Sequence, residues 1–344
     1  MNQIHEKMIQ AVIQKAEQVC PGALALIGVY GSVATGDVHN RSDLDLLILI
    51  EDERGRALAT GMILEDVGIG YDLYCTTWES LRRDAEIYHA HVAKLMDCKV
   101  VYVGKEGAYE ELCRLREQAA QRLQTEVRFE RAGMLMDRAK ALFADVCLSE
   151  SLGDARVFAC YLIDDLAGAL MLHNGRYFRL GTKRMLEELA ALPGTDVWIE
   201  LVKGIALARD LHTLQRRCRE SLRIAQSLMQ PNAEKRAPSA ALAGTYEEMY
   251  SNWRNKMVSA AESQDVFSSF ANLCGLHGML AEISREYSIA SYDVMGAYDP
   301  DRLSQNTELF DRCLQAYESE YQKAGISVKR YADVDAFVAE YLQN

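Results

Sequence analysis

The sequence has no long uncharged hydrophobic run, no paired-cysteine motif and no excess of positive charge. Without a run of about 18 uncharged apolar residues, a membrane-spanning helix is not expected. None of the nine cysteines forms a CxxC pair, so the sequence supports neither a zinc site nor a disulfide framework. The opening segment, MNQIHEKMIQ, lacks the apolar core of a signal peptide, which predicts a cytoplasmic location.

Acidic side chains outnumber basic ones. The chain has 50 Asp and Glu against 38 Lys and Arg, which gives a net charge of −12 over 344 residues. Nonspecific binding to nucleic acid depends on Lys and Arg neutralising phosphates, so nucleic acid is not an expected partner. A small cationic molecule is compatible with this charge, although many cytosolic enzymes are acidic.

The chain can bury a large core, because it has 344 residues and 49% of them are hydrophobic. A chain of this length is expected to form two or three domains. Residues 1–106 alternate predicted strands and helices, which indicates an α/β domain with a mixed sheet flanked by helices. The rest is expected to be largely α-helical, with one domain over residues 107–232 and a C-terminal subdomain over residues 240–344. The segment MQPNAEKRAPSA holds two of the five prolines and is the predicted linker.

The spacing of apolar residues predicts the individual elements. In the α/β domain, we expect helices over residues 2–19, 53–67 and 77–96, and strands over residues 24–30, 43–50, 71–75 and 99–103. In the helical part, the predicted helices span residues 108–150, 153–173, 181–192, 196–229, 245–290, 301–323 and 332–342.

The loop between the first two predicted strands carries the most information. An apolar run ends at Tyr30 and meets Gly31-Ser32, and a later apolar run opens with Asp43 and Asp45. Residues two apart in a strand face the same side, so the two aspartates should project together. Two carboxylates at a strand start repel each other and resist desolvation. A bound divalent cation such as Mg²⁺ would resolve that conflict.

This loop resembles the GS…DxD motif of polymerase-β-type nucleotidyltransferases. The residues that carry the resemblance are Gly31-Ser32, Gly36 and Ser42-Asp43-Leu44-Asp45. The match is closest to small bacterial members that adenylylate aminoglycosides and related antibiotics, and it covers roughly residues 20–105. In that family a third acidic residue lies on a neighbouring strand, and Asp72 in GYDLYC occupies a fitting position.

The resemblance implies a role for each of these residues. Asp43 and Asp45 would bridge two Mg²⁺ ions, and Asp72 would hold the catalytic ion and help to deprotonate the acceptor. The alternative for Asp72 is a strand residue that caps a nearby loop. The residues implied in nucleotide binding are Gly31, for close approach of the backbone to phosphate, and Ser32, Arg41 and Ser42. Arg41 could equally be a solvated loop residue.

A basic cluster stands out in the helical region, in the segment NGRYFRLGTKRML. Its four cations are Arg176, Arg179, Lys183 and Arg184. One interpretation is a turn that faces the cleft and binds the triphosphate, with Arg179 or Lys183 as the favoured ligands. The other is the start of a helix with solvated cations, and the sequence does not decide between them.

Several other polar residues have simpler expected roles. Asp84 falls on a predicted helix, where exposure is the usual outcome. His89 and His91 would not share a helical face, so a metal site there is not expected. Asp164 and Asp165 lie in an apolar helix, where a helix-surface or interhelical polar contact is predicted.

The function implied by the resemblance is Mg²⁺-dependent transfer of a nucleoside monophosphate, in the simplest case AMP from ATP, to a hydroxyl of a small molecule. An aminoglycoside-like antibiotic is the acceptor that it suggests. Two alternatives stay open: a regulatory or antitoxin-type enzyme that adenylylates a protein, and a non-catalytic nucleotide-binding protein of the same fold. A polynucleotide polymerase is the least favoured, because no basic stripe is evident. The oligomeric state is left open.

Overall fold

The computed structural model describes residues 3–38, 43–230 and 235–342. The chain divides into two compact units, residues 1–231 and residues 232–344. The division lies within the predicted linker. The first unit contains the whole predicted α/β domain, residues 1–106. It also contains the predicted helical domain, residues 107–232, except for the last residue. Their separation into two domains stays a prediction.

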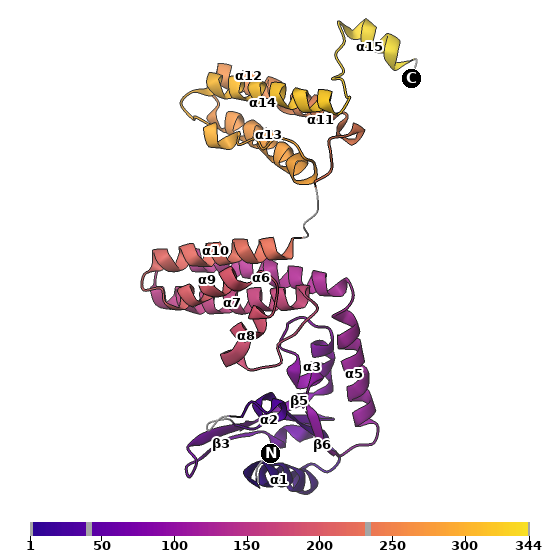
Figure 1. The fold of residues 1–344 in the computed structure, drawn as a ribbon, viewed down its shortest axis with the longest axis vertical. Coiled ribbons are helices and arrows are strands. Elements are labelled where there is room, and N and C mark those ends of the chain that lie inside the picture. Colours follow the sequence, from indigo (N-terminus) through magenta and orange to yellow (C-terminus); the bar gives the residue numbers. More distant parts are fainter. Residues whose placement is uncertain (1–2, 39–42, 231–234, 343–344) are drawn as a thin grey trace. The chain divides into compact units, whose positions relative to one another are not determined.

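The first unit begins with an α/β region built around one mixed sheet (Figure 1). Its elements are α1 (Gln3–Val19), β1 (Leu24–Tyr30), α2 (Gly31–Thr35), β2 (Asp45–Ile50), the 3-10 helix η1 (Glu53–Leu58), β3 (Thr60–Leu64), β4 (Ile69–Leu73), β5 (Cys75–Thr77), α3 (Trp78–Ala85), α4 (Ala93–Met96) and β6 (Lys99–Val103). The sheet has the strand order β5-β2-β1-β6. Strand β1 runs antiparallel to β2 and β6, and β2 runs parallel to β5. Strands β3 and β4 form a separate hairpin.

Both faces of the sheet are buried, and each belongs to a different core. On β2, Leu46 and Ile48 pack with α1 and the hairpin. Leu47 and Leu49 point the other way, into a core shared with α3 and the later helices. Each such buried side chain contributes roughly 1.5–3 kcal/mol. Asp45 lies on the same face of β2 as Leu47 and Leu49, so its carboxylate faces the helical part of the unit.

The predicted helix over residues 53–67 is wrong. Residues 53–58 form η1, and β3 then pairs with β4 from Thr60 opposite Leu73 to Leu64 opposite Ile69. Gly68, at φ 64°, lies in the turn of this hairpin, where the absence of a Cβ atom removes the steric cost. The apolar spacing of the segment fits a helix, but cross-strand pairing decides its conformation.

Three other predictions for the α/β region differ from the structure. Strand β2 begins at Asp45, so Asp43 precedes the strand instead of opening it. The strand expected over residues 71–75 is split between β4 and β5, and only β5 joins the main sheet. The helix expected over residues 77–96 is two helices, because Ile87, at φ 51°, cannot continue a right-handed helix.

The first unit continues as a helical region (Figure 1). Its elements are α5 (Ala108–Arg122), α6 (Val127–Leu148), α7 (Leu152–His173), the 3-10 helix η2 (Thr182–Arg184), α8 (Met185–Ala190), α9 (Asp196–Ala206) and α10 (Leu211–Met229). The helices predicted over residues 108–150 and 196–229 are each two helices. Asp210 explains the second break, because its carboxylate accepts the Thr213 N–H at 2.8 Å and caps α10.

The second unit is helical and has its own apolar core. Its elements are η3 (Ala240–Leu242), α11 (Thr245–Met249), the π-helix η4 (Tyr250–Arg254), α12 (Asn255–Ser263), α13 (Val266–Glu286), η5 (Met295–Ala297), α14 (Leu303–Lys323) and α15 (Val334–Tyr341). The Tyr321 hydroxyl accepts the Tyr246 N–H at 2.9 Å and donates to the Leu242 carbonyl at 2.7 Å. In the described parts of both units, none of the helices has the length and apolar character needed to cross a membrane.

Candidate functional site

The turn between β1 and α2 brings the Gly-Ser segment against Asp45. Tyr30 ends β1 directly opposite Asp45 of β2, and Gly31 follows at once. Gly31 has φ 64°, and a Cβ atom there would lie 1.9 Å from the Asp45 Oδ2 atom. Glycine is required because any other side chain would be strained and would collide with this carboxylate. Ser32 follows, partly buried, in α2, which ends at Thr35 and is capped by Gly36 with φ 81°.

Asp43 and Asp45 form an acidic pair beside this turn. Burial, followed by the charge of Asp43, raises the pKa of Asp45 to about 6. Asp43 is exposed. A cation that binds both carboxylates would remove the repulsion between them, and hard oxygen donors suit Mg²⁺.

A single phenol is influenced by the charges of four carboxylates. Burial is the first cause that raises the pKa of Tyr30 to about 12, and the charges of Asp45, Asp43, Asp72 and Asp84 add to it. Asp72 is exposed on β4 and alternates with two residues buried in the hairpin core, so it points away from that core. Asp72 therefore lies within electrostatic range of the same phenol as the acidic pair.

The three predicted metal ligands are not gathered into one cluster. Within the described residues, no group of three Asp, Glu, His or Cys side chains is close enough together to hold a metal ion. The triad of Asp43, Asp45 and Asp72 therefore stays a prediction. The acidic pair alone still fits Mg²⁺, which proteins often bind through one or two carboxylates, the remaining ligands being phosphate oxygens and water.

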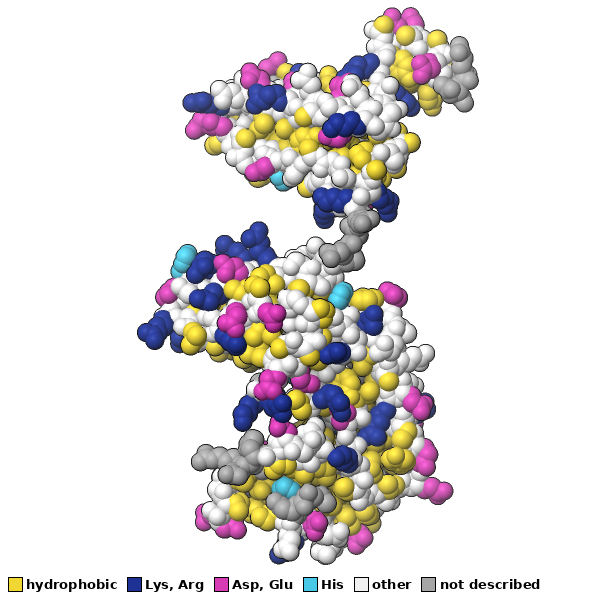
Figure 2. All heavy atoms as spheres, viewed as in Figure 1, with side chains coloured by type: hydrophobic (Ala, Val, Ile, Leu, Met, Phe, Trp, Pro, Cys, Tyr) yellow, Lys and Arg dark blue, Asp and Glu magenta, His cyan; other side chains and the backbone are white. Residues whose placement is uncertain are grey.

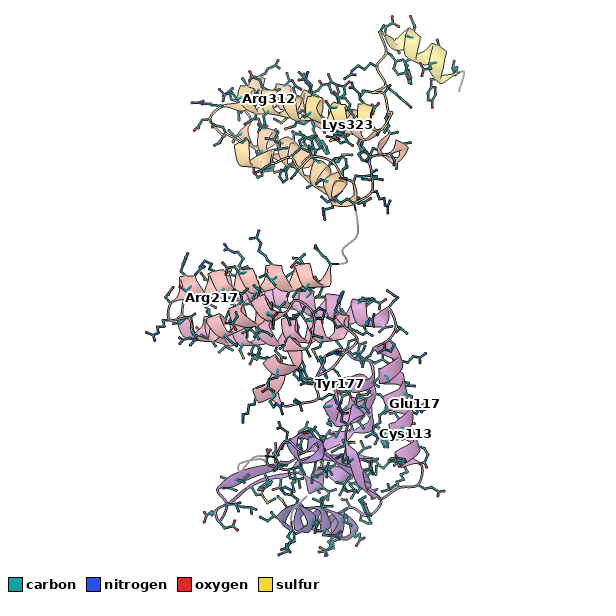
Figure 3. All side chains as sticks on the ribbon, viewed as in Figure 1. Cys113, Glu117, Tyr177, Arg217, Arg312 and Lys323 are labelled. Atoms are coloured by element: carbon teal, nitrogen blue, oxygen red, sulfur yellow. The ribbon has the colours of Figure 1, made fainter. Side chains whose placement is uncertain are left out.

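The segment that follows α7 returns to the α/β region and is fixed there by several contacts. Phe178 is buried, and its N–H donates to the Ala90 carbonyl at 2.9 Å. Tyr177 (Figure 3) donates its hydroxyl to Asp97 at 3.0 Å. The guanidinium of Arg179 donates to the same Asp97 oxygen at 3.3 Å. The basic cluster predicted from the sequence is thus held against residues 90–97.

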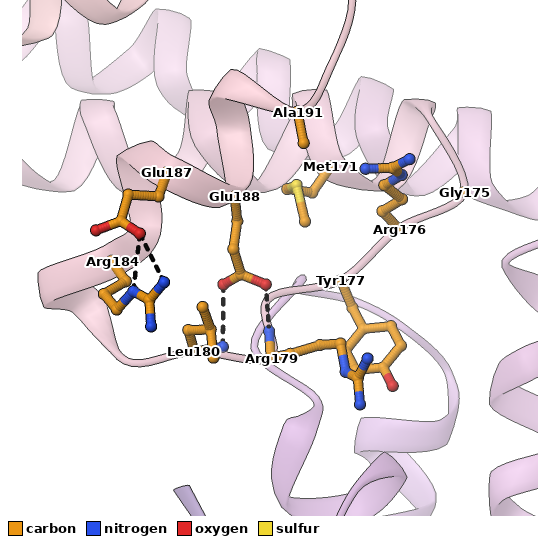
Figure 4. Close-up of a pocket in the computed structure, with 10 residues that line it drawn as sticks. All are labelled: Met171, Gly175, Arg176, Tyr177, Arg179, Leu180, Arg184, Glu187, Glu188 and Ala191. Carbon is orange, nitrogen blue, oxygen red and sulfur yellow. Dashed lines mark hydrogen bonds and ion pairs between the residues drawn. The ribbon is translucent and has the colours of Figure 1, made fainter. Parts of the chain in front are cut away.

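Glu188 of α8 orders the basic turn from its other side (Figure 4). Its carboxylate accepts the N–H groups of Arg179 and Leu180, both at 3.0 Å. Arg184 forms an ion pair with Asp37, just after α2, at 2.8 Å. The basic turn is therefore connected to the loop that follows the Gly-Ser segment.

Arg179 and Leu180 line three neighbouring cavities. One of about 360 Å³ is also lined by Gly31, Asp45 and Lys94, and we call it the Asp45 cavity. A second, of about 480 Å³, also includes Gly31. A third, of about 540 Å³, lies on the α8 side of the turn (Figure 4). Figure 2 shows basic and acidic side chains gathered around the hollow below α8.

The predicted nucleotide ligands have different outcomes. Gly31 and Arg179 border the same two cavities. Lys183 is exposed, borders none of the three, and has no ion-pair partner among the described residues. Arg41 and Ser42 lie outside the described residues, so their assignment stays a prediction.

Asp84 is the candidate residue that the sequence did not reveal. Exposure was expected, yet Asp84 is only 8% exposed and lines the Asp45 cavity. Its Oδ2 atom is buried and has no hydrogen-bond partner in the described structure, although the Lys94 Nζ atom lies 3.3 Å away. No motif marks this residue, because its burial results from packing between α3 and later helices.

The other polar residues of this region make structural contacts. Asp165 of α7 accepts two hydrogen bonds from Arg138 of α6, which confirms the predicted interhelical contact. Asp164 bonds His91 at 2.9 Å, and the His91 ring stacks on Phe178 with a centroid distance of 4.9 Å. His91 thus supports the segment that carries Arg179.

Comparisons with known proteins find a family match for the α/β region. A family model described as Nucleotidyltransferase domain matches residues 6–111. No match is found among curated proteins. Among solved structures, the chain is similar to a nucleotidyltransferase-like protein from Exiguobacterium sibiricum 255-15, at 17% identity and a TM-score of 0.33. That alignment covers 71% of this chain and 80% of the other.

Proposed function

We propose that the nucleotidyltransferase domain of residues 6–111 transfers a nucleoside monophosphate from an NTP, in the simplest case AMP from ATP, to a hydroxyl of a small molecule. The observation that carries the proposal is the close fit of Gly31 against Asp45 in a cavity that Arg179 also lines. A phosphate-binding turn, a carboxylate and a cation are thus placed around one space.

The reaction needs the acceptor oxygen and the α-phosphorus to be brought into line. A bond forms between these two atoms, and the bond from the α-phosphorus to the oxygen that bridges the β-phosphate breaks. Pyrophosphate leaves, and the hydroxyl proton passes to a carboxylate or to water. The Gly31 backbone and the Ser32 hydroxyl would hold the phosphates, and Arg179 would neutralise part of their charge.

Asp43 and Asp45 would hold Mg²⁺, with Asp72 as the third ligand. The ion would supply charge stabilisation at the attacking and leaving oxygens. Asp45 is suited to this role because its pKa of about 6 leaves it ionised at pH 7.5, while its partial burial makes a bound cation favourable.

The acceptor is proposed to be a small molecule with a free hydroxyl group. An aminoglycoside-like antibiotic is one such acceptor, and this suggestion rests only on the sequence resemblance. The helical elements bring Phe178 and Arg179 to the Asp45 cavity, which gives that region a part in holding substrates.

The test is pyrophosphate release from each of the four common NTPs, with Mg²⁺ and a panel of hydroxylated small molecules, including aminoglycosides. The wild-type protein should release pyrophosphate with one class of acceptor, and Asp45→Asn should not. Asp66→Asn is the matched control, because Asp66 is an exposed aspartate in the β3–β4 turn. Equal turnover by Asp45→Asn and Asp66→Asn would refute the proposal, as would ATP binding without pyrophosphate release for any acceptor.

A further inference from the structure

Another cavity opens on the far side of Asp84. It measures about 420 Å³ and shares Asp84, His89 and Lys94 with the Asp45 cavity. Its remaining walls are formed by Tyr74, Thr76, Ser80, Arg83 and Tyr88. We call it the Asp84 cavity. Because three side chains border both spaces, a molecule held in the Asp84 cavity lies next to the proposed site of phosphate chemistry.

The boundary between the two cavities contains buried polar atoms without hydrogen-bond partners among the described residues. The Asp84 Oδ2 atom and the His89 Nδ1 atom are both buried, and neither has a hydrogen-bond partner among the described residues. The Asp84 Oδ1 atom lies 3.5 Å from His89 Nε2. The Lys94 Nζ atom, 3.3 Å from the Asp84 Oδ2 atom, compensates its charge but makes no hydrogen bond with it, and a ligand hydroxyl in the cavity would supply the missing donor.

The turn that carries His89 has an unfavourable backbone conformation and is held by contacts from two helices. Ile87 is fully buried and has φ 51°, which is rare for a β-branched residue. Arg122 donates to the Glu86 carboxylate at 2.6 Å, and Arg131 donates to the Glu86 carbonyl at 3.2 Å. The Arg131 guanidinium also lies 4.1 Å from the centre of the Tyr88 ring. Two helices of the helical region thus stabilise a strained turn, as expected where the turn shapes a binding site.

The charge of the Asp84 cavity is opposite in sign to that of the whole chain. Arg83 and Lys94 outnumber the single carboxylate of Asp84, whereas the chain carries a net charge of −12. Arg83 is exposed and has no ion-pair partner among the described residues. Two hydroxyls, Thr76 and Ser80, and two phenols complete a lining suited to a polar ligand.

We propose that the Asp84 cavity is the acceptor subsite, and that it takes a polyhydroxylated small molecule carrying an anionic group, such as a phosphorylated or carboxylated sugar. This assignment rests on the proposed nucleotidyl transfer. Asp84 accepts a hydrogen bond from an acceptor hydroxyl, and Arg83 pairs with the anionic group. A polycation would meet Arg83 and Lys94, so an aminoglycoside fits this cavity poorly.

The test is isothermal titration of the full-length protein with ribose 5-phosphate, gluconate, ribose and kanamycin, with and without a non-hydrolysable ATP analogue. The two anionic probes distinguish a phosphate from a carboxylate as the recognised group. Arg83→Gln is the test variant, since an exposed arginine can be changed without unfolding the protein. Arg82→Gln is its neighbour control, because Arg82 pairs with Glu111 at 3.3 Å and lines neither cavity.

At least one anionic sugar should bind about tenfold more tightly than kanamycin, and Arg83→Gln should weaken that binding about tenfold, the effect of losing one charge-assisted hydrogen bond. Arg82→Gln should leave it unchanged. Tighter binding of kanamycin, equal effects of the two variants, or no binding of either anionic sugar would overturn the assignment. ATP binding is measured separately, so anionic-sugar binding at Arg83 without any ATP binding would count against the nucleotidyl transfer and not against the pocket chemistry.

Discussion

The two compact units differ in how they treat buried polar groups. In residues 232–344, the buried Asn306 accepts the Asp299 N–H at 3.0 Å and donates to the Asp299 carbonyl at 2.8 Å. No buried side-chain nitrogen or oxygen in the described part of that unit lacks a hydrogen-bond partner. In residues 1–231, Asp84, His89 and Asp97 each have a buried atom without one, and all three line cavities. The buried Trp198 and Ser221 each have one too. Such atoms are therefore found in the first unit, at its cavities and elsewhere, and not in the described part of the second.

The largest expected effect is the loss of activity on removing one charge from the first unit. Asp45→Asn should lower the rate of pyrophosphate release by about 10³-fold or more, because the site loses a cation ligand. Its melting temperature should equal or exceed that of the wild type, since the Asp43–Asp45 repulsion is also removed. A variant that turns over normally, or that is inactive only because it is unfolded, would contradict this prediction.

In the second unit, removing a buried hydroxyl group should lower the stability of the unit and leave the activity unchanged. Tyr321→Phe removes a hydroxyl that bonds Tyr246 N–H and the Leu242 carbonyl, and it should cost about 1–3 kcal/mol in the unfolding free energy of that unit. Urea unfolding monitored by tryptophan fluorescence would measure the loss. A change in the KM for ATP at unaltered folding would show that the second unit also takes part in substrate binding.

The raised pKa of Asp45 predicts a pH dependence of stability in the metal-free protein. Below pH 3.8 the Asp45 carboxyl is protonated in both the folded and the unfolded state, so it does not change the free energy of unfolding. Between pH 3.8 and about 6 only the unfolded state ionises, so the free energy of unfolding should fall, by about 1–2 kcal/mol. Above pH 6 the carboxyl is ionised in both states, so the free energy of unfolding should fall no further. The decrease should be absent from Asp45→Asn, and Mg²⁺ at pH 8 should reverse it in the wild type alone.

The basic turn offers a smaller test. Arg179→Gln should raise the KM for ATP about tenfold, because Arg179 lines the Asp45 cavity, whereas Lys183→Gln should change it less than twofold. Arg312→Gln is the control from the second unit, since Arg312 (Figure 3) is exposed and forms an ion pair with Glu308 at 3.8 Å. A larger effect for Lys183 than for Arg179 would reverse the assignment of these two cations.

The smallest predicted effect concerns two half-buried ion pairs, which should contribute similarly to the stability of the two units. Arg184 and Asp37 lie 2.8 Å apart in the first unit, and Arg254 and Asp311 lie 3.1 Å apart in the second. Double-mutant cycles on unfolding should give coupling energies of about 0.2–1 kcal/mol for both pairs, reduced by 1 M salt. A much stronger Arg184–Asp37 coupling would indicate that this pair fixes the basic turn.

Local patterns predicted the parts of the fold that depend on local forces. Strand β1 and strand β6 have the predicted bounds, and α1 ends at Val19 as predicted. Residues 53–67 were predicted to be helical because their apolar spacing fits a helix. Their true conformation depends on pairing with β4, which a spacing pattern does not encode. The break at Ile87 was missed for a similar reason, since burial in the core holds its unusual φ.

In the candidate site, too, some features follow from local sequence and others depend on long-range contacts. The proximity of Gly31 and Asp45 follows from two adjacent strands and a short motif, and the sequence indicated it. The contact of Tyr177 with Asp97 joins residues 80 positions apart, and the burial of Asp84 depends on helices far along the chain. Such long-range contacts leave no local signal, so the cavities around Asp84 and Asp97 became visible only in the folded chain.

The most direct test of the central claim follows two radioactive labels. The protein is incubated with Mg²⁺, a small-molecule extract and ATP labelled on either the α- or the γ-phosphate. Nucleotidyl transfer predicts that the α label appears on an acceptor, that the γ label appears only in pyrophosphate, and that Asp45→Asn does neither. Transfer of the γ label to an acceptor, or equal transfer of the α label by Asp45→Asn, would contradict the account.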